Sequence, residues 1–209
     1  TETKKKNESR LRRALPGKNS SKTPEAGGLQ PQTPTENAAR IFLLENAQEY
    51  TIMEITFQGA PMPNTLKVFS PVDGAVVPLE QVPDPVFSEH MLGDGIAVDP
   101  ANDTVFAPFD GKIINFNKAS HALVLGRDGA EVLIHVGLET VSLKGEGFTP
   151  LAKAGDSVTL GQPLLKFSQE VLAQKAASPF VMVVVTAPAD APALQKADGL
   201  VKAGQPLFE

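Results

Sequence analysis

The sequence has no cysteine and no long hydrophobic segment. The absence of cysteine excludes disulfide bonds, zinc–thiolate sites and thiol catalysis, and it is consistent with a reducing compartment. No apolar run approaches the roughly 18 residues of a transmembrane helix, and the N-terminus lacks the hydrophobic core of a signal peptide. We therefore expect the chain to lie in the cytoplasm.

Basic residues are scarce outside the N-terminal region. Residues 1–40 contain nine Lys or Arg and four Asp or Glu, a net charge of +5, whereas residues 41–209 contain ten and twenty, a net charge of −10. An acidic body argues against nucleic-acid binding, because a phosphate backbone requires a basic surface. The basic arm is interpreted as a solvated tail or as a segment near an anionic membrane surface.

The composition divides the chain into two parts. We predict that residues 1–64 are a basic linker rich in Pro, Ser and Gly and mostly disordered, because residues 1–37 cannot bury enough apolar area to offset the entropy of ordering. Residues 38–57 are more apolar and predict a short helix followed by a strand, and residues 58–64 form a second linker. Residues 65–209 are predicted to be one folded domain.

The folded part has the pattern of a β protein, with short β segments separated by Gly and Pro. The chain contains 18 prolines and 17 glycines, which suits a turn-dense β fold. Val68–Gly74 recurs as Val105–Gly111, and Gly161–Leu165 recurs as Gly204–Phe208. We predict an all-β antiparallel β-sandwich, a barrel-sandwich hybrid with duplicated hairpin motifs and one or two short helices, of which Ser168–Ala177 is the clearest.

Two of the three histidines flank one predicted hairpin. Turn-forming residues around Asp128 lie between two apolar runs, so a hairpin is expected there. In a hairpin centred on Asp128, His121 and His135 would face each other with Cβ atoms about 4.5–5.5 Å apart. Leu123 and Leu133 would share their face, and a shift of one residue in register would place the two histidines on opposite faces.

Three readings of this histidine pair follow from its chemistry. A lone histidine in an apolar strand is usually a hydrogen-bonded core residue, but two adjacent imidazoles repel if both are protonated. Metal binding would need a third ligand, and no His-x-His or His-Glu-x-x-His spacing supplies one. Phosphoryl transfer needs one nucleophilic nitrogen, a neighbour that stabilises the phosphoryl oxygens and a dry pocket. Without a P-loop or kinase motif, the phosphoryl group would come from another protein.

The segment Gly129–Val141 has a specific order of residue types: Gly, two free positions, three apolar residues, His, apolar, Gly, apolar, any, Thr, apolar. Other short motifs accompany it, namely Val82–Phe87, Gly93–Val98, Ala107-Pro108, His121-Ala122 and Leu143–Phe148. In this order they resemble the glucose-type enzyme IIA domain of the bacterial phosphoenolpyruvate-dependent sugar phosphotransferase system (PTS). The resemblance covers the chain from about Thr65 to Glu209.

The resemblance implies an antiparallel β-sandwich that acts as a phosphocarrier without a cofactor. His135 would be phosphorylated on Nε2 by the carrier protein HPr, with its Nδ1–H held by a backbone carbonyl near Gly137. His121 would hydrogen-bond the phosphoryl group, which would then pass to a cysteine of a IIB domain that phosphorylates sugar during uptake. Because the chain has no cysteine, it does not contain that IIB nucleophile.

The resemblance also implies a rim around the site where HPr and the IIB domain dock. Val86 and Phe87 would form its apolar part, Asp84 and Glu139 would be its acidic positions, and Gly137 would lie on the same surface. The family has an Asp where this chain has Glu139, a longer carboxylate.

A second departure from the family concerns the orientation of His121. Many members carry Thr two residues before the second histidine, where this chain has Ala119 followed by Ser120. His121 is therefore expected to be oriented by another group.

Two alternative functions remain beside the carrier. One is a regulatory IIA domain fused to a sugar permease or IIC domain, with residues 1–37 as a tether at the inner face of the membrane. The other is a zinc peptidase of related β-sandwich fold. Apart from that alternative we expect no bound metal, although His121 and His135 could bind zinc weakly with a partner's carboxylate. His90 is predicted to be a surface residue without a catalytic role, and Asp73 and Asp110 to be turn residues.

Overall fold

The computed structural model describes residues 66–186 and 194–208 in full, and the backbone of residues 38–43 and 51–56. The linkers predicted at 1–37 and 58–64 lie outside these residues. The backbone segments are β1 (Ala38–Leu43) and β2 (Thr51–Thr56), which pair antiparallel. The helix expected in the first of them is therefore wrong. Ile41 and Phe42 are a β-branched and an aromatic residue, which favour a strand once a partner strand is present.

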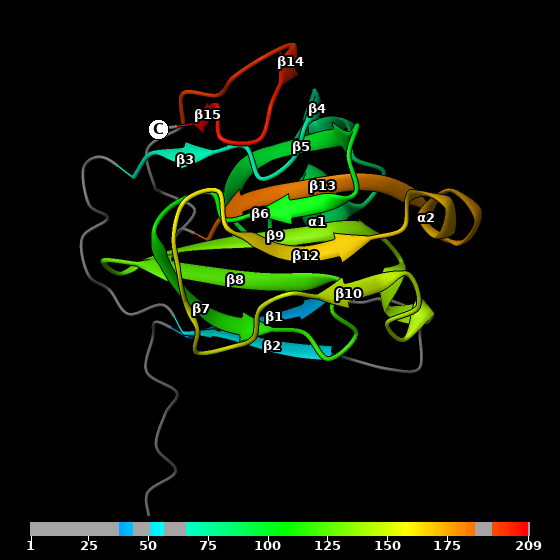
Figure 1. Cartoon of the computed structure of the whole chain (residues 1–209), viewed down its shortest axis with the longest axis horizontal. Helices are drawn as coiled ribbons and strands as arrows, with labels where there is room; N and C mark the ends of the chain where they lie inside the picture. The colour runs from blue at the N-terminus through cyan, green and yellow to red at the C-terminus, as the bar shows by residue number, and fades with distance from the viewer. Residues whose placement is uncertain (1–37, 44–50, 57–65, 187–193, 209) are drawn as a thin grey trace, which may run out of the picture. The chain divides into compact units, whose positions relative to one another are not determined.

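The described strands of the folded part form one large antiparallel sheet and two smaller ones (Figure 1). The large sheet has the order β11 (Ser157–Val158), β7 (Gly111–Phe116), β8 (Ala122–Arg127), β9 (Ala130–Leu138), β13 (Ser178–Val185), β5 (Asp94–Pro100), β4 (Gly74–Pro78) and β14 (Leu200–Val201). The smaller sheets are β10 (Phe148–Pro150), β12 (Pro163–Phe167) and β6 (Thr104–Phe106), and β15 (Pro206–Phe208) with β3 (Val68–Phe69).

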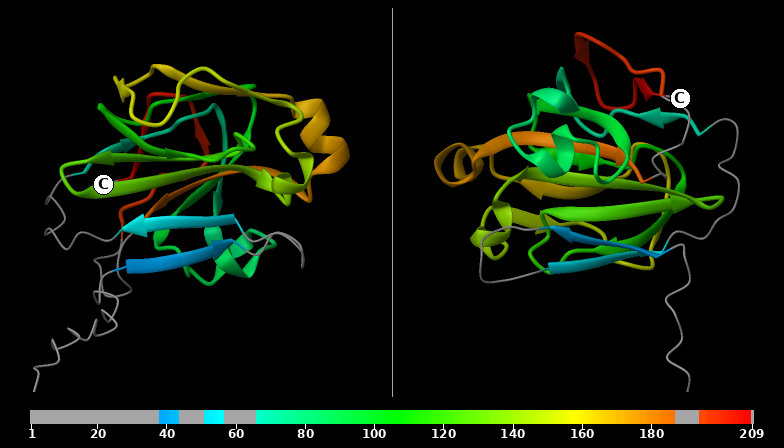
Figure 2. Two further views of the ribbon diagram at one scale, coloured as in Figure 1. Left: turned by 90° about the horizontal axis from the view of Figure 1, so that it is seen from below. Right: turned by 180° about the vertical axis from the view of Figure 1, so that it is seen from behind.

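The two faces of the large sheet are buried by different elements. Leu123 and Ile134 point to one face, where they share a core with Leu165 of the β10–β12–β6 sheet. Figure 2 shows this small sheet stacked on the large one. Val124 and Leu133 point to the other face, where they pack with residues of η1 (Leu79–Gln81) and α1 (Pro85–Ser88). The fold is thus an antiparallel β-sandwich with a few short helices, as the sequence predicts.

The predicted helix at Ser168–Ala177 is observed as α2 (Gln169–Lys175). Ser168 is its N-cap, since its hydroxyl accepts a hydrogen bond from the backbone N–H of Val171 at 3.2 Å. This bond satisfies one of the backbone donors that the first turn leaves free. Leu172 is buried and anchors the helix to the large core.

The two repeated motifs of the sequence bind each other in the structure. Asp110 Oδ1 accepts a hydrogen bond from the backbone N–H of Leu160 at 2.7 Å, and Asp73 Oδ1 accepts one from the N–H of Ala203, also at 2.7 Å. Leu160 and Ala203 are the residues just before the two Gly-Gln-Pro loops. Each copy of the Asp-Gly motif is therefore hydrogen-bonded to the backbone beside one copy of the Gly-Gln-Pro motif.

Backbone hydrogen bonds repeat the same arrangement. Around the first loop, the N–H of Ala107 donates to Gln162 and that of Gly161 donates to Ala107. Around the second loop, the equivalent bonds are Ser70 N–H to Gln205 and Gly204 N–H to Ser70. The predicted duplication of strand–turn–strand units is therefore confirmed as a repeated local arrangement. Asp73 and Asp110 have the structural role expected of them, but their partners are loops distant in sequence rather than their own turns.

The two equivalent hydrogen bonds predict matched losses of stability. We expect Asp73→Ala and Asp110→Ala each to lower the free energy of unfolding by about 1–2 kcal/mol, because each leaves a backbone N–H without its acceptor. The measurement is urea denaturation of each variant and of the double variant, in which the losses should add. Asp99→Ala, at an exposed carboxylate on β5, is the control and should stay within about 0.5 kcal/mol of wild type. Losses no larger than the control's would contradict the role assigned to the two carboxylates.

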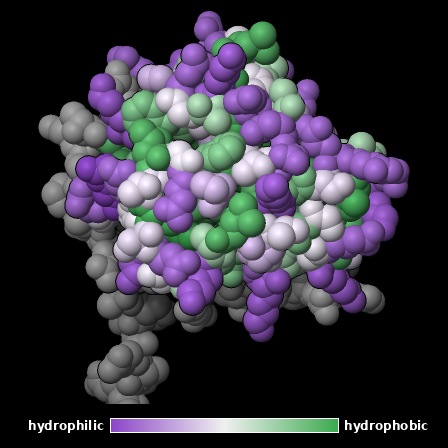
Figure 3. All heavy atoms as spheres, in the orientation of Figure 1, coloured by the Kyte–Doolittle hydropathy of each residue, from purple (hydrophilic) through white to green (hydrophobic). Residues whose placement is uncertain are grey.

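The surface facing the viewer in Figure 3 mixes hydrophilic side chains with small apolar patches. Five large apolar side chains of the described residues are exposed, namely Met91, Ile114, Leu151, Leu160 and Leu200. Apolar residues scattered singly over a surface are normal. Among the described residues, no helix is long and apolar enough to span a membrane.

Candidate functional site

The hairpin that carries the two histidines has a tighter turn than predicted. Arg127 pairs with Ala130, so the loop consists of Asp128 and Gly129 alone, with φ values of 52° and 86°. Two central residues with positive φ define the type I′ turn that Asp-Gly favours. The predicted register, centred on Asp128, is therefore wrong by one residue. As a consequence Leu133 lies on the face opposite Leu123.

The two imidazoles are nevertheless close to each other, but strand alternation is not the cause. Ala122, not His121, is opposite His135, and His121 lies just before β8 begins. Ser120 has a positive φ of 61°, so the backbone turns immediately before His121. The centroids of the His121 and His135 rings are 5.0 Å apart with an interplanar angle of 69°. The predicted proximity of the pair is confirmed, but the turn at Ser120 produces it.

His135 lies in the middle of a buried apolar layer. It is on β9 between Ala122 of β8 and Met182 of β13, and its exposed fraction is 0%. The ring of Phe87 meets the His135 ring edge-on, with centroids 5.5 Å apart and an angle of 61°. Aromatic pairs at such distances prefer this tilted geometry. The nucleophile candidate is therefore packed from one side by α1 and from the sheet side by its two neighbouring strands.

His121 is buried from the opposite side of the pair. Its exposed fraction is 1%, and the ring of Phe148 on β10 lies 6.3 Å from its ring, centroid to centroid. The backbone carbonyl of His121 accepts a hydrogen bond from the N–H of Val136 at 2.8 Å. Asn117 supports the approach to the pair, because its side chain accepts a hydrogen bond from the N–H of Ala119 at 2.7 Å. This asparagine shapes the loop at the position where Ala119 replaces the family's Thr.

The chain turns sharply just after His135. Gly137 has a φ of 75°, and a Cβ placed there would lie 2.5 Å from Cγ2 of Thr140. The pairing of β9 with β13 is irregular here, between Val181 and Ser178. The Thr140 hydroxyl donates to the carbonyl of Val136 at 3.0 Å. Gly137 and Thr140 thus shape the backbone directly after the nucleophile candidate, whereas the predicted bond from His135 to a carbonyl near Gly137 stays a prediction.

The predicted rim residues divide between rim and interior. Asp84 is half-buried and caps α1, since its Oδ1 accepts a hydrogen bond from the N–H of Val86 at 2.8 Å. Val86 is half-buried, whereas Phe87 is only 2% exposed and belongs to the wall of the site. Glu139 is exposed and has a φ of 59°. Asp84, Val86 and Glu139 therefore have surface for a partner, and Phe87 contacts the histidine itself.

The charged form of the Glu131 carboxylate on β9 is destabilised by burial. Glu131 is half-buried opposite Gly126, and desolvation raises the pKa of its carboxyl above the ordinary value of 4.5. A raised carboxyl pKa means that the folded state binds the proton more tightly, so stability is lost as the pH rises from 4.5 through the folded pKa.

We expect Glu131→Gln to raise the free energy of unfolding at pH 7, because it removes this desolvated charge. The gain should disappear well below pH 4.5, where the carboxyl is protonated in both states. Urea denaturation at pH 7 and at acid pH, beside the exposed-site control Glu89→Gln, measures the difference. An equal gain at both pH values would show that packing, not charge, is the cause.

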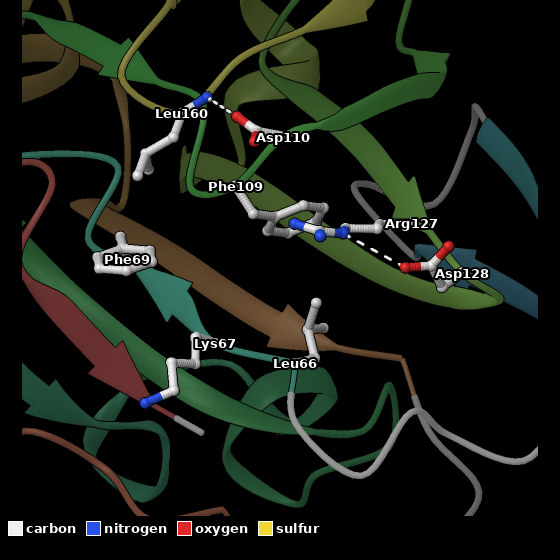
Figure 4. Close-up of a pocket in the computed structure, with 8 residues that line it drawn as sticks. All are labelled: Leu66, Lys67, Phe69, Phe109, Asp110, Arg127, Asp128 and Leu160. Atoms are coloured by element: carbon white, nitrogen blue, oxygen red, sulfur yellow. Dashed lines mark hydrogen bonds and ion pairs between the residues drawn. The ribbon is translucent and has the colours of Figure 1, made fainter.

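A pocket of about 370 Å³ lies away from the histidines. Figure 4 shows its lining, in which Arg127 pairs with Asp128 and Asp110 binds the N–H of Leu160. It adjoins the turn of the β8–β9 hairpin, whereas His121 and His135 are at the other end. Six residues of strand separate the two ends, roughly 20 Å. The pocket is therefore no part of the histidine site.

Metal ligands are not grouped in the described residues: no set of three His, Cys, Asp or Glu side chains there is placed to hold an ion. A zinc peptidase needs three protein ligands, so the described structure offers that hypothesis no support. Sequence reasoning missed Met182 and Asn117, and it quoted Phe148 without a role. The aromatic Phe148 carried a signal, but the contact of Met182 depends on strand pairing that no local pattern reveals.

The folded part of the chain is similar to known proteins. Residues 66–191 match the family described as phosphoenolpyruvate-dependent sugar phosphotransferase system, EIIA 1. The chain is 42% identical over 125 residues to the PTS system glucose-specific EIIA component of Oceanobacillus iheyensis, which covers 59% of this chain and 76% of that protein. It is 48% identical over 120 residues to the PTS system glucose-specific EIICBA component of Staphylococcus carnosus, or 57% of this chain but only 18% of that longer protein.

A solved structure shows the same fold. The glucose permease IIA from Mycoplasma capricolum matches with a TM-score of 0.65 at 34% sequence identity, covering 68% of this chain and 94% of that one. The β-sandwich with its buried histidine pair, the matched residues and the related structure together show that this chain belongs to the EIIA 1 family of the phosphoenolpyruvate-dependent sugar phosphotransferase system.

Proposed function

We propose that the chain is a IIA phosphocarrier in which His135 accepts a phosphoryl group from phospho-HPr and passes it to a cysteine of a IIB domain. The observation that carries the proposal is the pairing of two buried imidazoles 5.0 Å apart, one of them packed against Phe87. We assign the carrier domain to residues 65–209 and the linker, which includes the β1–β2 hairpin, to residues 1–64. The family match over residues 66–191 and the names of the relatives support the carrier assignment.

The chemistry is a transfer between nitrogen and sulfur nucleophiles without redox change. A neutral imidazole nitrogen of His135 attacks phosphorus, so that a new N–P bond forms as the bond to the carrier's histidine breaks. In the second step the cysteine thiolate attacks phosphorus and the imidazole of His135 leaves. The transferred phosphoryl group carries negative charge on its oxygens, and a hydrogen bond from His121 stabilises that charge in both steps.

The apolar walls serve this chemistry by excluding water. Phe87, Met182 and Phe148 surround the pair, and a dry site strengthens the hydrogen bond from His121 and protects the phosphohistidine from hydrolysis. Because both rings are buried, the docking of a partner on Asp84, Val86 and Glu139 must be accompanied by a rearrangement of the groups over the site. Partner docking and access to His135 are therefore coupled.

A regulatory IIA domain fused to a permease is the second candidate. It is favoured by relatives in which EIIA is part of a longer chain, such as the glucose-specific and glucoside-specific EIICBA components of Staphylococcus carnosus. In that arrangement the domain would be held at the inner face of the membrane. Both candidates require the same phosphorylated histidine, and they differ in the acceptor.

Incubation with phosphoenolpyruvate, enzyme I and HPr tests the proposal. We expect an acid-labile mass gain of one phosphoryl group that depends on HPr, and its loss on addition of a IIB domain. No gain in the complete mixture would refute the phosphocarrier function. A gain that no IIB domain removes would favour the regulatory candidate.

A further inference from the structure

Helix α1 places Phe87 against His135 but is too short to hold itself. It has four residues, whereas isolated helices below about 12 residues are marginal in water. Asp84 caps its start, and at its end the N–H of His90 donates to the carbonyl of Phe87 at 3.0 Å. The position of Phe87 therefore depends on the contacts that flank the helix.

His90 occupies an uncommon backbone conformation. Its φ is 55°, in the left-handed region that few residues other than glycine adopt. A strained residue next to a functional site is a reason to ask what its side chain does.

The imidazole of His90 contacts a carboxylate through each of its nitrogens. Nε2 lies 3.0 Å from Glu80 Oε1, and Nδ1 lies 3.3 Å from Asp94 Oδ1. Glu80 belongs to η1, just before α1, and Asp94 begins β5, just after it. The contact with Glu80 has the geometry of a hydrogen bond, and the contact with Asp94 is a polar contact. The ring thus links η1, which precedes α1, to the start of β5, which follows it.

The surrounding charges keep both carboxylates ionised. A backbone hydrogen bond and the contact with His90 hold the pKa of Glu80 below its ordinary value. Burial raises the pKa of Asp94, but the Lys196 ammonium and the backbone N–H groups of Gly95 and Leu194 outweigh it, so that pKa is also lowered. Lys196 therefore lies against the second carboxylate, and the His90 ring lies between Glu80 and Asp94.

We infer that His90 is a positioning residue: by bridging Glu80 and Asp94 it holds α1 in place, and with it the Phe87 ring against His135. The inference rests on the proposed function, in which His135 is the phosphoryl acceptor. It assigns His90, expected from sequence to be a surface residue without a catalytic role, to the support of the site.

His90→Gly is the sharpest test, because glycine relieves the backbone strain while it removes the ring. The Phe87 ring lies 5.5 Å from the His135 ring, close enough for its ring current to shift the His135 NMR signals. With three histidines in the chain, His121→Gln and His135→Gln suffice to assign the imidazole spectrum. We expect His90→Gly to move the His135 ring signals in the same direction as Phe87→Leu does. Glu80→Gln, which weakens one of the two contacts, should move them less.

The matched control is Arg127→Ala, which breaks the exposed Arg127–Asp128 pair at the other end of the hairpin and should leave these signals unchanged. Unchanged His135 signals in folded His90→Gly, or an equal change in the control, would overturn the inference.

The transfer assay adds a second, independent result. With phospho-HPr as donor, His90→Gly should accept the phosphoryl group about tenfold more slowly than wild type, since a small displacement at a reacting group is enough for such a loss. A wild-type rate in this variant would overturn the inference. If wild type itself accepts no phosphoryl group, the proposed function fails, while the NMR comparison still decides whether His90 positions α1.

Discussion

We expect His135→Gln to lose phosphoryl acceptance from phospho-HPr by at least about a thousandfold, to below detection, because the variant lacks the attacking nitrogen. Glutamine is preferred to alanine here since His135 is 0% exposed, and truncation of a buried ring would leave a cavity in the layer of Leu133 and Met182. The measurement is intact-protein mass spectrometry at neutral pH, before and after acid treatment.

The fold of the variant has to be shown separately. Circular dichroism and the NMR signals of His121 and His90 report on it, since both histidines remain in His135→Gln. His90→Gly is the matched comparison for phosphorylation, because it removes another histidine but should still acquire the acid-labile group. Complete phosphorylation of His135→Gln would show that the acceptor is a different residue.

The second large effect concerns the transfer onward from the phosphorylated protein. We expect His121→Gln to accept the phosphoryl group within about tenfold of the wild-type rate but to pass it to a IIB cysteine about a hundredfold more slowly. Removal of one donor to developing negative charge typically costs this much. The His121 ring lies 5.0 Å from the His135 ring, close enough for a hydrogen bond to a phosphoryl group on His135. The measurement is the single-turnover rate of each half-reaction, with purified phosphoprotein for the second.

The two half-reactions separate the roles of the two histidines. Equal loss of acceptance in His121→Gln and His135→Gln would show that the division of roles is wrong. Asn117→Ala offers a graded comparison, because it removes the side-chain bond to Ala119 and loosens the loop before His121 without changing either imidazole. It should slow the second half-reaction less than His121→Gln does.

Several features of the site could be predicted from sequence because their causes are local. The Asp-Gly pair at 128–129 marks a hairpin turn, and the same pair also favours the two-residue type I′ loop that is observed. The observed hairpin is nevertheless not centred on Asp128 but differs by one residue in register, so Leu133 lies on the face opposite Leu123. The two histidines still meet because Ser120 turns the backbone before β8. Single left-handed residues of this kind carry little signal in a sequence.

One of the two described α-helices could be predicted from local sequence and the other could not. Ser168 and the apolar spacing after it predict α2, since the cap and the helical periodicity lie within a few residues of each other. Helix α1, with four residues, has no periodicity to detect. It exists because Asp84 caps it and its neighbours hold it in place, so its position over His135 could not be foreseen.

By itself, the sequence determined the β-rich fold class, the repeated motifs, the hairpin and the two histidines that flank it. These depend on residue type, turn chemistry and short-range alternation. The tertiary structure alone decided that Met182 lies beside His135, 47 residues earlier in the chain. It also decided that Asp110 and Asp73 bind the backbone just before the two Gly-Gln-Pro loops, and that His90 contacts both Glu80 and Asp94. Such contacts depend on the packing of the whole domain, because many pairings have similar local energies and only the complete core selects one of them.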